Sequence, residues 1–510
     1  MPDQTGVPPT PPAATQRVAG TGASRRLTLL RPKPPNRAYA LDALRGLAIL
    51  GMVLSGQLPF GANSLPAWMY HAQVPPPEHK WIGTLPGITW VDLVFPFFLF
   101  ALGAAIPLAL GRRLEQGGPK WKAGLFIIER GLLLGFFALY VQAIRPFVIS
   151  EHPSATTWLV GLLGFALLSP VLTRLPGSWP AGWRWGIRIG GWAGAAALLA
   201  LLRYPDGSGF SLERSDIIII VLANMAVFGS FVWWLTRGKL LLRLGVLGVL
   251  IAIRLSNMPH PIGGWVSDIW AWSPVPWIYR LYYLQYLFIV VPGTIAGDLL
   301  LQWLAGGAGN VASNSCDKPA WSPLRYTAIA GLMLGMTVVL VAGLKARWLV
   351  PTSLAAFALC GFGWWLLSKP VTATERLFRA LFNWAIYWLV LGLFFEPYEG
   401  GIKKDRATMS YYFVTGGCAI CVLIALSILV DVFRRRRGVQ LLVENGQNPM
   451  IAYAGINNLV LPVLALIGAN KVLAVLDATP WLGFVRAAII TLLLALSVSA
   501  FTKLKVFWRT

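Results

Sequence analysis

Long apolar stretches recur along almost the whole chain and decide what it can fold into. Each is about twenty residues long, which as an α-helix crosses roughly 30 Å of hydrocarbon. The 510 residues are 56% hydrophobic and 12% charged, whereas an average soluble domain has about 25% charged residues. Because lipid offers no hydrogen bonds to an open backbone, the sequence predicts an all-α, polytopic membrane protein.

The apolar stretches predict about fourteen transmembrane helices. Three of them, 183–202, 240–256 and 449–468, are weaker than the others, so twelve spans are the alternative. The predicted cores are 41–60, 89–111, 122–144, 155–173, 183–202, 216–236, 240–256, 281–304, 326–344, 348–368, 380–396, 409–432, 449–468 and 482–502.

The placement of lysine and arginine predicts a cytoplasmic N-terminus. These residues concentrate in the N-terminal tail and in the even-numbered connections, which include Arg112, Arg113 and the run 434–437. Residues 1–36 are rich in proline, threonine, alanine and glycine, a composition that predicts a disordered cytoplasmic tail. Residues 37–510 form one transmembrane domain. The net charge of +23 is explained by topology and anionic lipid headgroups, so nucleic acid is not an expected partner.

The first loop on the outside, roughly 61–88, carries His71 and His79, two of the four histidines. Histidine suits acyl transfer because its ordinary pKa of about 6.5 lets it accept a proton from an amine or a hydroxyl near neutral pH. A solvated histidine is the alternative at both positions. The loop leads to Asp92, which either caps the second span or orients an imidazole.

Polar side chains inside the spans are costly in lipid and therefore informative. Asp42 and Arg45 lie three residues apart, on one helical face, and are expected to pair near the cytoplasmic end of the first span. Arg130 lies deeper, in the third span, where a functional role and a pairing role are equally open. Asn224 is expected to make an interhelical hydrogen bond, with a ligand contact as the alternative. No spacing of cysteine and histidine predicts a metal site.

Two motifs taken together resemble a known family. The segments are 41–46 (LDALRG), followed by an apolar span, and 87–100 (GITWVDLVFPFFLF), preceded by the histidine loop. They resemble heparan-alpha-glucosaminide N-acetyltransferase and its bacterial relatives. The stretches 214–224 and 292–297 are also similar, so the resemblance covers most of the chain from about residue 37.

The resemblance implies a transmembrane acyltransferase of a bacterial inner membrane. Such an enzyme takes an acetyl group from cytoplasmic acetyl-CoA and delivers it to an amino or hydroxyl group of a periplasmic saccharide. It implies that Asp42 and a histidine before the second motif take part in catalysis. His79 is preferred to His71 because it lies nearer that motif, although the loop is longer and richer in proline than the family pattern. Candidate residues for binding substrate or cofactor are Arg45, Asp92, Arg130 and Asn224.

A transporter or flippase for a glycolipid or a small polar solute is the competing class, because a dozen spans with scattered charges suit it as well. That class predicts two pseudo-symmetric halves, and the sequence shows no such correspondence. The partners expected of the acyltransferase are acyl-CoA, a saccharide acceptor and the lipid bilayer, with a homodimer left open. The acyl chain length, and the choice between direct transfer and an acyl-histidine intermediate, are also left open.

Overall fold

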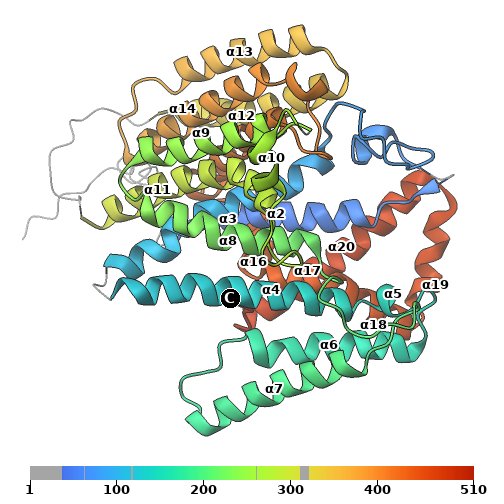
Figure 1. The fold of residues 1–510 in the computed structure, drawn as a ribbon. Helices are drawn as coiled ribbons and strands as arrows, with labels where there is room; N and C mark the ends of the chain where they lie inside the picture. The colour runs from blue at the N-terminus through green and yellow to red at the C-terminus, as the bar shows by residue number, and fades with distance from the viewer. Residues whose placement is uncertain (1–36, 62–63, 116–118, 260, 310–320, 510) are drawn as a thin grey trace, which may run out of the picture. The chain divides into compact units, whose positions relative to one another are not determined.

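The computed structural model describes residues 37–509 except 62–63, 116–118, 260 and 310–320. Within this part the regular structure is helical, and loops join the helices (Figure 1). No strand occurs within these residues, and Thr173 and Trp508 form an isolated antiparallel bridge. The predicted tail, 1–36, lies outside the described residues. The prediction of an all-α protein is confirmed.

Twelve helical segments among the described residues are long and apolar enough to cross a membrane, which confirms the polytopic class. They are α2 (Tyr39–Gly56), α3 (Trp90–Glu115), α4 (Lys120–Ala143), α6 (Ala155–Leu172), α8 (Ile217–Leu235), η4 (Leu281–Tyr286) continuing into α11 (Leu287–Gly309), α12 (Pro323–Lys345), α13 (Leu349–Leu366), α14 (Ala373–Phe394), α15 (Met409–Ser427) continuing into η6 (Ile428–Val432), the broken span of α17 (Pro449–Gly455), η8 (Ile456–Val460) and α18 (Leu461–Leu466), and α20 (Pro480–Lys503).

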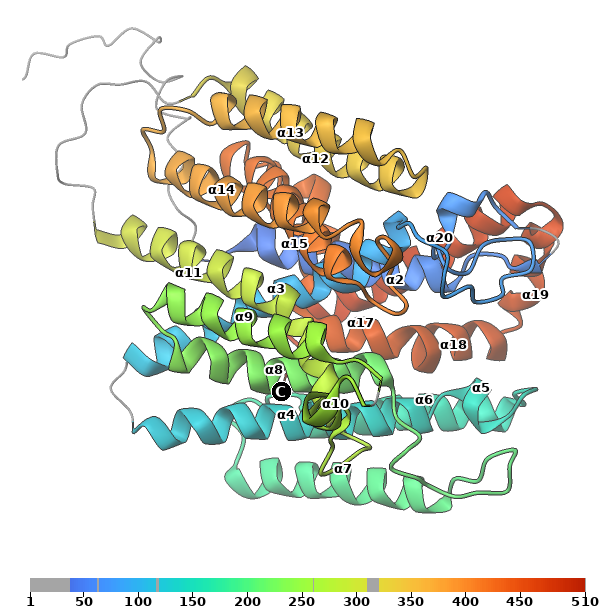
Figure 2. The same cartoon turned by 45° about the horizontal axis from the view of Figure 1, so that its top comes forward.

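Shorter or less apolar helices connect and flank these segments. They are η3 (Ala67–Met69), α5 (Pro146–Ile149), α7 (Ala181–Leu201), α9 (Leu240–Ser256), α10 (Gly264–Ala271), η5 (Tyr398–Gly400), η7 (Arg437–Val439), α16 (Gln440–Gln447), α19 (Ala469–Leu473) and η9 (Ala474–Ala478). Two of them, α7 and α9, coincide with two of the three weak predicted spans. Figure 2 shows α7 beside α6 and α9 beside α8.

The ends of α8 show that α7 and α9 also cross the bundle. Asp216, at the start of α8, forms an ion pair with Arg145, which follows α4, and Arg237, just after α8, pairs with Glu115 at the end of α3. The helix α6 starts at the level where α4 ends. Because α8 starts at that level too, the chain must cross the bundle twice before α8, once in α6 and once back in α7. The same reasoning applies to α9, between α8 and α11. The described chain therefore crosses the bundle fourteen times, and twelve of these segments are long and apolar enough to be candidate membrane spans.

Two glycines bring α16 into backbone contact with α2. A Cβ atom added at Gly46 would lie 1.8 Å from the carbonyl oxygen of Leu442, and one added at Gly446 would lie 1.8 Å from the carbonyl oxygen of Asp42. Small residues of this kind let helices in membranes pack closely. The contact also brings the carbonyl oxygen of Gly446 within 3.1 Å of the Arg45 guanidinium.

We predict that Gly446→Ala destabilises the protein by about 1–3 kcal/mol, because the added methyl group forces the two backbones apart. Thermal unfolding of purified protein in detergent measures the change. Gly331→Ala on α12 is the matched control, since nothing lies within 4 Å of the added atom, and it is expected to stabilise slightly, by about 0.5–1 kcal/mol. Equal melting temperatures for the two variants would contradict close α2–α16 packing.

Candidate active site

Asp92 lies in the first turn of α3 and its side chain is fully buried. One carboxylate oxygen, Oδ2, accepts hydrogen bonds from the backbone N–H of Thr89 (2.9 Å), the Thr89 hydroxyl (3.2 Å) and the backbone N–H of Ala72 (3.2 Å). The other oxygen, Oδ1, lies 2.7 Å from Nδ1 of His71. The carboxylate therefore does both things that the sequence left as alternatives: it caps the helix and orients an imidazole.

His71 is the histidine that the fold brings to this carboxylate. Since a carboxylate only accepts, the 2.7 Å contact requires Nδ1–H of His71 to donate, and in the neutral ring this makes Nε2 the acceptor. The side chain is about one-third exposed, at 34%. A buried carboxylate that fixes the tautomer and orientation of a partly exposed imidazole is the arrangement that makes histidine a general base.

Lys404 completes this cluster from a distant part of the chain. Its Nζ lies 3.2 Å from both ring nitrogens of His71. The loop that carries Lys404 is joined to the histidine loop by two further contacts: the backbone N–H of Gly87 donates to the carbonyl of Ile402 (2.7 Å), and the Lys404 N–H donates to Oε1 of Gln73 (3.4 Å). A cation is thus placed within reach of any group that approaches the imidazole.

A proline inside α3 ties the same residue to α15. Pro96 has no N–H, so the carbonyl of Asp92, four residues earlier, lacks its usual helical donor. The buried hydroxyl of Tyr411 on α15 donates to that carbonyl instead, at 2.8 Å. Asp92 is therefore fixed through its side chain by the loop and through its backbone by a neighbouring helix.

His79 lies in a different environment. Its ring packs edge-on against Phe60 and Tyr70, with both pairs of ring centroids 4.6 Å apart, and its Nε2 is 2.9 Å from the hydroxyl of Ser64. Its Nδ1 is buried without a hydrogen-bond partner. The preference for His79 rested on its proximity to Asp92 along the sequence, but the loop folds back so that His71 meets the carboxylate.

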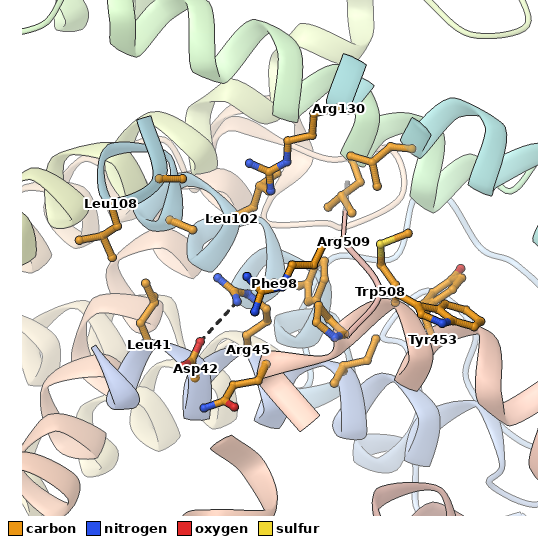
Figure 3. Close-up of a pocket in the computed structure, with 18 of the residues that line it drawn as sticks. Leu41, Asp42, Arg45, Phe98, Leu102, Leu108, Arg130, Tyr453, Trp508 and Arg509 are labelled. Atoms are coloured by element: carbon orange, nitrogen blue, oxygen red, sulfur yellow. Dashed lines mark ion pairs between the residues drawn. The ribbon is translucent and has the colours of Figure 1, made fainter. Parts of the chain in front are cut away.

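A cavity of about 560 Å³ opens among α2, α3, α4 and the C-terminal segment, at the face where α2 begins. Figure 3 shows Arg45, Arg130 and Arg509 directed into it. The ion pair expected between Asp42 and Arg45 is present, with Oδ1 and Nη1 3.5 Å apart. Among the described residues, the cavity wall contains seven arginines and one carboxylate, that of Asp42; the arginines are Arg37, Arg45, Arg112, Arg113, Arg130, Arg174 and Arg509.

The arginines of this cavity have too few anionic partners. Asp42 serves Arg37, at 2.7 Å, as well as Arg45. Arg130 forms no hydrogen bond or ion pair with the described residues, and its Nε is buried. Partial burial, followed by the charges of Arg174 and Arg37, lowers the pKa of Arg509 below its ordinary value. An anion bound in the cavity would relieve this mutual repulsion.

One helix connects the arginine cavity with the Asp92–His71 pair. The cavity wall includes Arg112 and Arg113 near the end of α3 and reaches back to Phe98. Phe98 is six residues from Asp92, or about 9 Å along the helix axis at 1.5 Å per residue. The apolar inner end of the cavity therefore points toward the carboxylate, with Ile49, Met52, Phe98 and Leu102 among its lining.

The structure separates the remaining candidate from these sites. The amide of Asn224 donates to the carbonyls of Ile220 (2.8 Å) and Ile278 (2.7 Å), so it makes the packing contact that its position inside a span predicts. Asp42, Arg45 and Arg130 share the cavity, while His71 and Asp92 share the opposite end of α3. Neither Arg509 nor Lys404 was a candidate from the sequence, because only the folded chain brings the C-terminus and a distant loop to these places.

We predict that Asp92→Asn lowers the stability of the protein by about 1.5–3 kcal/mol, because the amide cannot replace a charged acceptor of several hydrogen bonds. Thermal unfolding in detergent measures the loss, and limited proteolysis is expected to cut the 71–89 loop faster. Glu78→Gln is the control on the same loop; its carboxylate is 70% exposed, and its effect is expected to stay within about 0.5 kcal/mol. Equal effects of the two substitutions would contradict the structural role of Asp92.

Comparison with known proteins places this architecture in a family but attaches no activity to it. No curated protein matches the chain. Residues 37–300 match a family described as a domain of unknown function, DUF5009. The matched segment includes the arginines of α2 and α4, His71 and Asp92. As the match covers more than half of the 510 residues, the chain belongs to the DUF5009 family.

Proposed function

We propose that this protein is a membrane acyltransferase that uses acyl-CoA, with acetyl-CoA as the expected donor, to acylate a saccharide on the opposite side of a bacterial inner membrane. The observation that carries the proposal is the pairing of two half-sites on α3. One is an arginine-rich cavity with too few anions, and the other is a carboxylate-oriented histidine. The concentration of basic residues on the side of Arg37 supports a cytoplasmic donor site.

The arginine cavity suits the polyanionic part of acyl-CoA. Guanidinium groups bind phosphate through paired, charge-assisted hydrogen bonds. Arg112, Arg113 and Arg174 lie at the exposed mouth, whereas Arg45 and Arg130 lie deeper. Keeping Arg130 without an anionic partner at this depth costs free energy, and a bound polyanion offsets that cost. The apolar inner end then accommodates the uncharged arm that carries the thioester.

The histidine cluster suits the transfer step. Nε2 of His71 accepts the proton of the acceptor amine or hydroxyl as that nitrogen or oxygen forms a bond to the acyl carbon. The carbon–sulfur bond breaks, and the coenzyme A thiolate leaves and takes up the proton that the His71 imidazolium returns. Asp92 stabilises the imidazolium that forms, and Lys404 is placed to stabilise negative charge on the acyl oxygen. An acyl-histidine route uses the same Nε2 as nucleophile, so both routes stay open.

Transfer of label from radioactive acetyl-CoA to a panel of amino sugars by purified protein in detergent tests the proposal. We expect His71→Ala to slow transfer by about 10²–10⁴-fold, the usual contribution of a general base. His79→Ala is expected to change the rate less than about tenfold, since its effect is limited to loop packing.

Loss of transfer in His79→Ala alone would return the catalytic assignment to that residue. A wild-type protein that neither binds nor turns over any acyl-CoA would sink the proposal and favour the transporter class. Flux of a glycolipid or polar solute in reconstituted vesicles would then be the next measurement.

Binding of coenzyme A, measured by calorimetry, tests the donor site separately. We expect Arg130→Gln to weaken binding by about tenfold, because one charge-assisted contact to phosphate is lost. Arg237→Gln is the matched control: it removes an arginine near the same face that pairs with Glu115 and does not line the cavity. Equal affinities for both variants would place the phosphates elsewhere.

A further inference from the structure

A second cavity, of about 890 Å³, lies at the opposite face of the protein. Four separate parts of the chain form it: the loop after His71, the end of α9, the α10–η4 region, and the loop between α14 and α15. Its lining residues are Trp81, Gly83, Thr84, Arg254, Asn257, Trp270, Tyr282, Gln285, Glu399, Lys403, Arg406, Ala407 and Thr408.

The cavity adjoins the histidine cluster. Lys403 lines it, and the next residue, Lys404, contacts both ring nitrogens of His71. On its other side, the loop that carries Trp81 is joined to the histidine segment by a hydrogen bond from the Ile82 N–H to the Gln73 carbonyl, at 2.8 Å. The two loops that hold the imidazole therefore also form part of the wall of this cavity.

The lining carries an excess of positive charge. Glu399 is the one carboxylate among its described lining residues, and it already pairs with Arg254 at 2.6 Å. The Nζ of Lys403 donates to the backbone carbonyl of Glu399, at 2.8 Å, so its charge is not neutralised. Arg406 is exposed and forms no ion pair with the described residues. Two cations thus face the cavity without an anion.

Aromatic side chains supply the flat walls of the same cavity. Trp81 is 58% exposed, and Trp270 and Tyr282 are half-buried. Rings of this kind offer an apolar face together with a polar edge, a surface that suits a sugar ring, which has apolar C–H faces and hydroxyl edges. Gln285 and Asn257 add amide groups that can hydrogen-bond hydroxyls.

We propose that this cavity binds the acceptor and that the acceptor is an acidic saccharide, one that carries a carboxylate or another anionic group besides the amine or hydroxyl to be acylated. The proposal rests on the acyltransferase function for the fate of the acceptor, but the binding itself does not depend on it. Arg406 and Lys403 recognise the anion, and Trp81 packs against the ring. Anionic lipid headgroups share this chemistry, so the test must separate the two sources.

Muramic acid and glucosamine form a matched pair of probes, because both are amino sugars and only muramic acid has a carboxylate. Calorimetry with wild-type protein in zwitterionic nanodiscs, without acyl donor, is expected to show muramic acid binding at least about tenfold more tightly. The difference should shrink as the salt concentration rises. Equal affinities, or no binding of muramic acid at millimolar concentration, would overturn the proposal.

Two substitutions locate the binding. Arg406→Gln is expected to weaken muramic acid by about tenfold and to leave glucosamine nearly unchanged. Lys80→Gln is the control, since it removes an exposed cation from the Trp81 loop that does not line the cavity. Equal losses in both variants would mean that general surface charge attracts the sugar and would contradict the site.

Two more readouts separate the sources and the two proposals. If nanodiscs that contain phosphatidylglycerol abolish muramic acid binding, a lipid headgroup occupies the cavity and the acidic-saccharide proposal fails. Tight, Arg406-dependent binding without transfer of label from acetyl-CoA would leave the saccharide site standing and refute the acyltransferase function. Transfer to glucosamine with no preference for muramic acid would support the acyltransferase function and refute the acidic-saccharide site.

Discussion

The buried carboxylate of Asp92 determines how the loops around His71 are arranged. A carboxylate removed from water costs several kcal/mol unless hydrogen bonds and a nearby positive charge compensate it. Here the compensation comes from Thr89, Ala72 and His71, and the Lys404 ammonium lies just beyond. All three of these residues belong to the loop that precedes α3, so satisfying one side chain closes this loop over the start of the helix, and Lys404 joins through His71 from a loop distant in sequence.

The other end of α3 shows the opposite electrostatic condition. The polar groups around Asp92 are matched, whereas the arginines around Arg45 and Arg130 outnumber the carboxylates among the described residues that line their cavity. Structural ion pairs are usually completed within the fold. Charges left unmatched inside a membrane bundle therefore mark the place where a ligand belongs. The contrast between the two ends matches the two roles that we propose for them: an anion site at one end and an oriented base at the other.

The sequence predicted the features that local pattern controls. Apolar length predicted the crossings, including α7, which is only weakly apolar, and α9, which has only 17 residues. Spacing along one helix predicted that Asp42 and Arg45 would pair. The sequence did not predict which of His71 and His79 contacts Asp92. Loop 61–88 folds back on itself, so His71 contacts Asp92 although His79 is nearer along the sequence. Lys404 and Arg509 reach their sites through tertiary contacts that no local spacing records.

The length of α3 sets the distance between the mouth of the arginine cavity and the Asp92–His71 pair. From Asp92 to Arg112 the helix rises about 30 Å, which is the thickness of the hydrocarbon core of a bilayer. In the proposed reaction, a donor bound by its charged end at the mouth of the arginine cavity must therefore carry its reactive carbon on a long, thin, uncharged arm. A compact activated acyl group, such as an acyl phosphate, held by the same arginines would end far short of His71. Under the proposed function, the helix would thus select among activated acyl compounds by their reach, independently of how tightly their phosphates bind.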